Sequence, residues 1–218
     1  MKQVFLRKVS QMQAVIRIEG LKNAIKDLNP RIYQSALAAT VNDLSRAVKT
    51  EVAQRIKTRY TIQSSRVKAG IGLKARAMRL RPQAVIEFMR KPPGLQHYKA
   101  IQITTAGVRY SVKGKGKEIT KRQLKRGKST QGVSVEVIRG QRKIVQRAFL
   151  AAMRRGGIGI WKIKKGTKRK LERLYGPSVG GMFRAIDGVK IAKRVINERV
   201  EKVFLRQVER YKHRTGTA

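Results

Sequence analysis

A single apolar stripe constrains the fold of this chain more than any other feature of its sequence. Between positions 30 and 60, apolar side chains recur every three or four residues: Tyr33, Leu37, Val41, Leu44, Val48, Val52, Ile56 and Tyr60. This spacing places them along one side of an α-helix of about 45 Å. Asn29 and Pro30 come just before it, a preferred cap residue and a preferred first helical residue. We therefore expect a long helix whose apolar stripe faces the core of the protein. The alternative is that the stripe fills a groove on a binding partner.

Short runs of alternating or β-branched residues elsewhere predict strands. They lie at 14–18, 84–89, 108–112, 133–137, 145–151 and 158–163. Most of them are not separated by a segment long enough for a crossover helix, which favours antiparallel pairing. A second helical pattern covers 185–212. The expected fold class is α+β, with a long N-terminal helix and a C-terminal helix packed on a small antiparallel sheet of four or five strands.

This pattern also suggests how the chain is organised. Residues 1–29 form an entry arm, in which Ala14–Ile18 is strand-like and Leu21, Ile25 and Leu28 have helical spacing. Residues 30–184 form the α+β core, with a basic insertion at 113–128. Residues 185–218 form an amphipathic helix and a basic tail. Gly176 and Pro177 mark the boundary between the last strand and the last helical region.

The charge of the chain is its second strong constraint. It has 53 Lys and Arg against 12 Asp and Glu, a net charge of +41, and its 41% hydrophobic content is too high for a disordered chain. Such a chain repels itself when compact and needs polyanions or acidic neighbours. No sequence-reading motif is visible, and aromatic residues make up only 6% of the chain. Any contact with DNA is therefore expected to be with phosphates and independent of sequence.

Two basic clusters are the candidate phosphate contacts. The first is the 113–128 insertion, expected to be a solvated loop, and the second is the segment from Lys164 to Arg173. The candidate residues are Lys113, Lys115, Lys117, Lys121, Arg122, Lys125, Arg126, Lys128, Lys164, Lys165, Lys168, Arg169 and Lys170. The two clusters have two alternative roles. They pair with acidic neighbours in an assembly, or they form a solvated surface with no specific role.

Catalytic chemistry finds little support in the sequence. The chain has no cysteine, its two histidines, His97 and His213, lie outside any ligand-spaced motif, and no recognisable carboxylate pair is present. Gly114 and Gly116 lack the context of a phosphate-binding loop. We expect no enzyme, no metal site and no cofactor. The N-terminus lacks the apolar region of a signal peptide and no apolar run is long enough to span a membrane, so we expect a soluble protein made in a cytoplasm.

An ordered set of motifs resembles the prophage minor tail protein Z family, which comprises tail-completion proteins of long-tailed phages. The set consists of the strand Gly132–Val137, Gly140–Lys143, Ala148–Ala151, the strand that holds Trp161, Leu174–Val179, Met182–Phe183 and the final helix. The helix that carries Ala39–Asn42 is also similar to the family's N-terminal helix. The likeness covers most of the chain and is densest in 132–184, where Leu-Tyr-Gly-Pro-Ser-Val is the most specific piece.

The resemblance implies a non-enzymatic virion protein at the head-proximal end of the tail, in a ring of six on the DNA path. Its partners would be the tail terminator or tail tube protein and the head connector proteins, after assembly in the host cytoplasm. The candidate subunit contacts are Tyr175, Gly176, Pro177, Ser178, Met182 and Phe183, while 175–179 on its own is favoured as the turn that starts the last helical region. The alternative function is a non-sequence-specific nucleic-acid-binding protein of ribosomal or nucleoid type, which the charge fits equally well.

Overall fold

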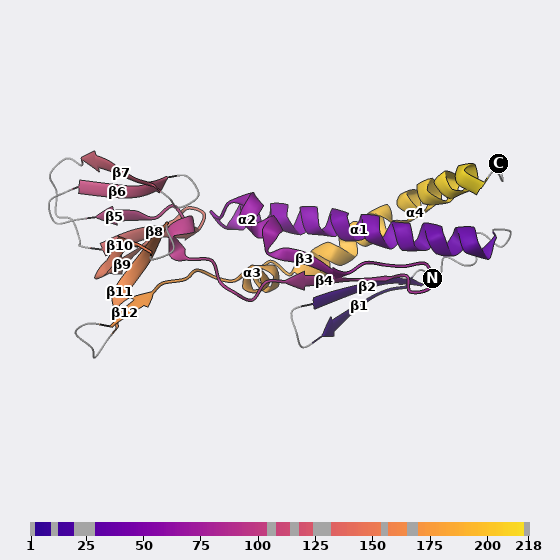
Figure 1. Cartoon of the computed structure of the whole chain (residues 1–218), viewed down its shortest axis with the longest axis horizontal. Coiled ribbons are helices and arrows are strands. Elements are labelled where there is room, and N and C mark those ends of the chain that lie inside the picture. Colours follow the sequence, from indigo (N-terminus) through magenta and orange to yellow (C-terminus); the bar gives the residue numbers. More distant parts are fainter. Residues whose placement is uncertain are drawn as a thin grey trace. The chain divides into compact units, whose positions relative to one another are not determined.

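The protein consists of two compact units that are discontinuous in sequence (Figure 1). The computed structural model describes residues 3–9, 13–19, 29–103, 108–113, 118–123, 132–153, 157–164 and 170–215. Unit 1 comprises Met1–Ile56, Val67–Arg90 and Val179–Ala218, and unit 2 comprises Lys57–Arg66 and Lys91–Ser178. The fold is mixed helix and sheet, with small antiparallel sheets, in agreement with the expected class.

Unit 1 combines helices with one sheet. Its strands are β1 (Gln3–Val9), β2 (Gln13–Glu19), β3 (Ile71–Ala75) and β4 (Gln83–Phe88), in the order β1-β2-β4-β3 and all antiparallel. Its helices are most of α1 (Pro30–Arg59), the end of α2 (Ser64–Ala69), α3 (Val179–Ala185) and α4 (Gly188–Thr215). The expected strand at 14–18, the strand at 84–89 and both long helices are confirmed. The helical spacing at Leu21, Ile25 and Leu28 lies outside the described residues.

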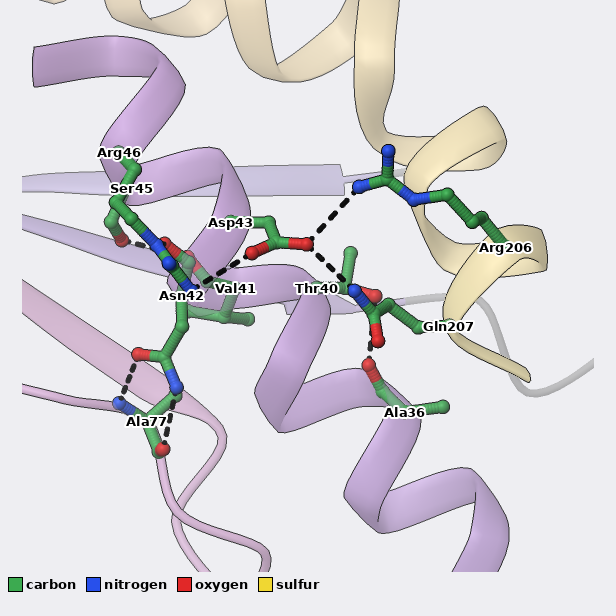
Figure 2. Close-up of polar contacts among 10 residues, drawn as sticks. All are labelled: Ala36, Thr40, Val41, Asn42, Asp43, Ser45, Arg46, Ala77, Arg206 and Gln207. Carbon is green, nitrogen blue, oxygen red and sulfur yellow. Dashed lines mark hydrogen bonds and ion pairs between the residues drawn. The ribbon is translucent and has the colours of Figure 1, made fainter. Parts of the chain in front are cut away.

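Helix α1 is the centre of unit 1, as the apolar stripe predicts. It begins where Asn29 caps it, with the Asn29 side-chain oxygen accepting from the Arg31 amide at 3.0 Å. Leu37, Val41, Leu44, Val48, Val52, Ile56 and Tyr60 of the stripe are all buried. The buried hydroxyls of Thr40 and Ser45 donate back to carbonyls one turn earlier, at 2.8 and 2.7 Å, so the core contains no unpaired hydroxyl there (Figure 2).

Helix α4 packs against α1 through apolar and charged contacts. The rings of Tyr33 and Phe204 meet edge to face at 5.9 Å. Asp43 accepts from Gln207 at 2.7 Å and from Arg206 at 3.2 Å, while Glu51 pairs with Arg194 at 3.6 Å (Figure 2 shows the Asp43 contacts). Asp43 and Glu51, two of the chain's 12 acidic residues, thus join the two long helices.

The junction between α3 and α4 is fixed by aromatic packing. Phe183 stacks on Phe88 of β4 with ring centroids 4.0 Å apart. A Cβ at Gly188 would lie 2.1 Å from the Phe183 ring, so only glycine fits beneath it. Asp187 has a left-handed backbone (φ 51°), which ends α3 and turns the chain into α4.

Unit 2 is built from two antiparallel sheets. The larger has the order β7-β6-β5-β8-β9, and the smaller has the order β10-β11-β12. The strands are β5 (Ile101–Ile103), β6 (Val108–Lys113), β7 (Glu118–Gln123), β8 (Gly132–Ile138), β9 (Gln141–Gln146), β10 (Ala148–Ala152), β11 (Ile158–Ile163) and β12 (Leu171–Arg173), and a short 3-10 helix, η2, covers Leu95–His97. The sheets meet where the Gln102 side-chain oxygen accepts from the Leu150 amide at 2.8 Å.

Three details of the expected strands were wrong. The strands do not form one sheet of four or five but are divided among three sheets. The 145–151 run is two strands in different sheets, because Arg147 between them has a left-handed backbone (φ 58°) that redirects the chain. The 113–128 segment is not a continuous loop, since Glu118–Gln123 pairs with β6. Among the helices that the structure describes, none combines the length and apolar character needed to cross a membrane.

Candidate nucleic-acid interface

The first basic cluster lies on a hairpin at the edge of the larger sheet of unit 2. Strand β7 is the outermost strand and pairs only with β6, in a register that sets Lys113 opposite Glu118 and Arg109 opposite Arg122. Lys113 therefore lies at the end of β6, and Lys121 and Arg122 lie on β7. A strand rich in Lys and Arg is typical of sheet edges, where charge prevents further strand pairing. Lys115, Lys117, Lys125, Arg126 and Lys128 lie outside the described residues.

The second basic cluster lies on the hairpin that joins β11 to β12. The Lys164 amide donates to the Lys170 carbonyl at 2.8 Å, which brings together two exposed lysines that are six positions apart in sequence. The same hairpin sets Lys162 opposite Glu172. Lys165, Lys168 and Arg169 lie outside the described residues. The described members of both clusters thus lie on or beside strand pairs at sheet edges.

One acid organises the cations of a third hairpin, between β8 and β9. Glu136 pairs with Lys99 at 3.4 Å and with Arg142 at 3.8 Å, and it accepts from the Gly140 amide at 3.1 Å. The Gly140 hydrogen bond, followed by the charges of Lys99 and Arg142, lowers the pKa of Glu136. Arg142 also donates to Ser134 and to the Lys99 carbonyl, so it is bound in place rather than free to follow a ligand.

The Leu174–Val179 motif proves to be a backbone junction. Leu174 accepts from the Leu95 amide at 3.1 Å, Gly176 donates to the Pro93 carbonyl at 2.8 Å, and Gly94 and Tyr175 form a β-bridge. A Cβ at Gly176 would lie 2.2 Å from the Tyr98 ring. The fully buried Tyr98 donates its hydroxyl to the Pro177 carbonyl at 3.1 Å, and burial raises its pKa.

The six predicted subunit-contact residues have different surroundings. Tyr175 is 46% exposed, and the Arg173 guanidinium lies over its ring at 5.1 Å. Gly176 and Pro177 face Tyr98 within unit 2, and Ser178 ends that unit. Met182 and Phe183 are buried in the core of unit 1. Of the six, Tyr175 is the one that offers a large exposed side chain.

His97 is half-buried beside this junction. Burial and the nearby charges of Arg66 and Arg173 lower the pKa of His97 to about 4, so the ring is neutral at pH 7. The neighbouring Gln96 is buried, with its Nε2 3.4 Å from the His97 Nε2. The described residues contain no group of three or more His, Asp or Glu side chains arranged to hold a metal ion.

Sequence reasoning missed one side chain, that of Asn42, which positions the β3–β4 turn through a pair of hydrogen bonds. Asn42 on α1 makes two hydrogen bonds to Ala77, donating to its carbonyl and accepting from its amide, both at 2.9 Å (Figure 2). The sequence singles out Asn42 only within the helix that resembles the family's N-terminal helix, because a single polar residue on a helix gives no periodic signal. No family model, no curated protein and no solved structure matches this chain, so the family resemblance stays a prediction.

Proposed function

We propose that this chain is a non-enzymatic structural protein of a long-tailed phage virion. It forms a tail-completion ring, a hexamer, at the head-proximal end of the tail. The observation that carries the proposal is the Leu174–Val179 junction, the most specific part of the family resemblance. Its contacts at 174, 176 and 177 go to backbone groups of 93–95 and to the buried Tyr98. This is the behaviour of a structural joint, not of a reactive site.

The charge supports a place beside DNA. A hexamer would carry 6 × 41 = 246 formal positive charges, which requires counterions or a polyanion. The two basic hairpins of unit 2 are the proposed phosphate contacts, and sequence-independent binding follows from their composition. The tail terminator or tail tube protein and the head connector proteins are the proposed neighbours. Tyr175 is the proposed subunit contact, because an exposed Tyr is a common hot-spot residue.

Imaging tests the structural part of the proposal. Electron microscopy of the purified protein and of tails is expected to show a ring and to locate the protein at the head-proximal end. A protein that is monomeric under all conditions and absent from tails would contradict the proposal.

Salt dependence tests the DNA part. We expect neutralisation of Lys115, Lys117, Lys121, Arg122, Lys125 and Arg126 to weaken duplex binding and flatten its dependence on salt. Six phosphate contacts correspond to a log–log slope of roughly −5, which the variant should lose. An unchanged slope would remove this hairpin from the DNA path.

A second candidate is a nucleic-acid-binding protein of ribosomal or nucleoid type, and the net charge of +41 is the observation that favours it. It predicts duplex or RNA binding without a ring. The genes beside this one separate the two candidates, because neighbouring tail genes favour the virion protein.

A further inference from the structure

Unit 2 contains three buried polar atoms that have no hydrogen-bond partner within the described part of the chain. They are Oε1 of Gln96, Nε1 of Trp161 and Nε of Arg173. Gln96 as a whole is only 4% exposed. Each such atom is destabilising unless a partner from outside the chain supplies the missing hydrogen bond.

Strand register places the side chains of Trp161 and Arg173 next to each other. The two residues are Cα partners in the β11–β12 pair, so their side chains leave the sheet on the same face. The register continues past β12, because the amide of 174 donates to the carbonyl of 160 at 2.9 Å, and position 175 thus comes opposite position 159. Trp161 Nε1 lies over Gly159, 2.9 Å from where a Cβ would be, and the Arg173 guanidinium lies over the Tyr175 ring at 5.1 Å. Both N–H groups therefore extend toward the same end of the strand pair.

Gln96 reaches the same face from the other side of Tyr175. Gly94 and Tyr175 form an antiparallel bridge, so a side chain at 94 would point the same way as that of Tyr175. The Gln96 amide occupies that space, since a Cβ at Gly94 would lie 2.1 Å from Gln96 Oε1. The Gln96 Nε2 lies 3.4 Å from the Nε2 of His97, which leaves Oε1 as the atom without a partner in the described residues. Gly94 and Gly159 thus flank Tyr175 and leave room for the polar atoms above them.

The charges around these atoms favour an anion. Arg173 is one cation, and Arg66 of α2 is a second, because burial and the charges of both arginines lower the pKa of the half-buried His97. The one acid of the β11–β12 hairpin, Glu172, comes opposite Lys162 and therefore lies on the other face of the sheet. Two N–H donors and two guanidinium charges, with no carboxylate of this hairpin on the same face, suit an oxyanion.

We propose that Gln96, Trp161 and Arg173 form a binding site for one phosphate group, which enters beside the half-exposed Tyr175. The phosphate oxygens accept from Trp161 Nε1 and from Arg173 Nε, and guanidinium groups are well suited to phosphate. A tetrahedral phosphate presents oxygens in several directions, which fits donors from different strands better than a planar carboxylate does. The Gln96 amide accepts from a phosphate hydroxyl or, with its oxygen and nitrogen exchanged, donates to a phosphate oxygen. The site goes beyond the proposed function, because it needs neither a ring nor the cations of the two basic hairpins.

The indole N–H of Trp161 reports on this site, because Trp161 is the only tryptophan of the chain. Titration of the full-length protein with inorganic phosphate, at constant ionic strength, should move its signal in a proton–nitrogen correlation spectrum until the shift saturates. Arg173→Gln removes a donor and a charge and should weaken the apparent affinity about tenfold or more. Lys162→Gln removes an equal charge from the other face of the same strand pair and is the matched control, with unchanged affinity. Trp161→Phe removes only the Nε1 donor and should also weaken binding, followed at the His97 ring signals. Circular dichroism checks that each variant is folded.

Each outcome of the titration decides for or against the site. An indole signal that does not move, a shift that never saturates, or equal losses in Arg173→Gln and Lys162→Gln would overturn it. Acetate that saturates the signal as readily as phosphate would show a carboxylate site and would overturn the choice of phosphate. A short DNA duplex distinguishes the two sources of the group: competition with inorganic phosphate at the indole signal indicates a DNA phosphate, and its absence indicates free phosphate. A chain that binds inorganic phosphate but no duplex contradicts the DNA part of the proposed function and leaves the site standing.

Discussion

The two units reach stability by different routes. Unit 1 is organised around α1, whose buried side chains form its core, and two acids of α1, Asp43 and Glu51, join it to α4. The described residues of unit 2 contain no long helix beyond the end of α1, and they depend on strand pairing and on backbone junctions such as Gly176 with Pro93. The comparison suggests that apolar volume stabilises unit 1, while close backbone approach stabilises unit 2.

The largest expected effect is a cavity in unit 1. Leu44 is fully buried on α1, so Leu44→Ala should lower the free energy of unfolding by about 2–5 kcal/mol. Urea unfolding measures the loss, and hydrogen exchange should locate it in unit 1. Leu205→Ala, on the exposed side of α4, is the control and should change little. Equal loss of protection in both units would show that they unfold together and would weaken the comparison.

Overpacking should have the next largest effect, and in unit 2. Gly176→Ala puts a methyl group against the Tyr98 ring and should cost about 1–3 kcal/mol. Gly72→Ala is the matched control, because the space at Gly72 is open. The difference in urea midpoints between these two alanine variants measures the effect. Equal midpoints would mean that the Leu174–Val179 junction tolerates movement.

Loss of the Asn42 contacts should have a smaller effect, on unit 1. Asn42→Ala removes both hydrogen bonds to Ala77, and the half-buried position admits water, so we expect a cost of about 1 kcal/mol. Hydrogen exchange should rise at residues 76–81. Thr50→Ala, which removes an exposed bond to the Arg46 carbonyl, is the comparison variant. Unchanged exchange at 76–81 would show that Asn42 does not hold this turn.

At neutral pH, the smallest expected effect is that of His97, whose contribution to the stability of unit 2 appears only at lower pH. The pKa of His97 falls from 6.5 to about 4 in the folded chain, so the unfolded state binds this proton more readily. Stability should therefore decline as pH falls from 6.5 to about 4, with no contribution from His97 above that window. NMR titration of the His97 ring measures its pKa. The His213→Gln variant leaves one histidine signal, which is thereby assigned to His97. A His97 that titrates near 6.5 would contradict its burial beside Arg66 and Arg173.

Local patterns in the sequence predicted both long helices, but they predicted only some of the strands and little of the strand pairing. The stripe from Leu37 to Ile56 predicts α1 because apolar residues at a 3.6-residue period fall on one face of a helix. The Asn29 cap is equally local. Strand β3 was missed although Ile71, Leu73 and Ala75 alternate, because the run is short and lies within a basic segment, and β7 was missed because an edge strand carries charge.

Long-range contacts explain the rest of what the sequence did not reveal. Residues 57–66 join unit 2 through bonds such as Thr61 to Val137, 3.2 Å, between positions far apart in the chain. The change of sheet at Arg147 depends on one backbone angle. Composition was enough to find both basic clusters, but the approach of Lys164 to Lys170 follows from strand register, which composition does not contain.

In the proposed ring, the basic hairpins of unit 2 meet the DNA and the α1 core of unit 1 supplies most of the stability of the chain. A reconstruction of the purified full-length assembly by cryo-electron microscopy, with and without duplex DNA, tests this most directly. We expect a closed ring in which the basic hairpins of unit 2 face the DNA. Monomers at all concentrations, or a ring with the DNA away from both hairpins, would contradict this arrangement.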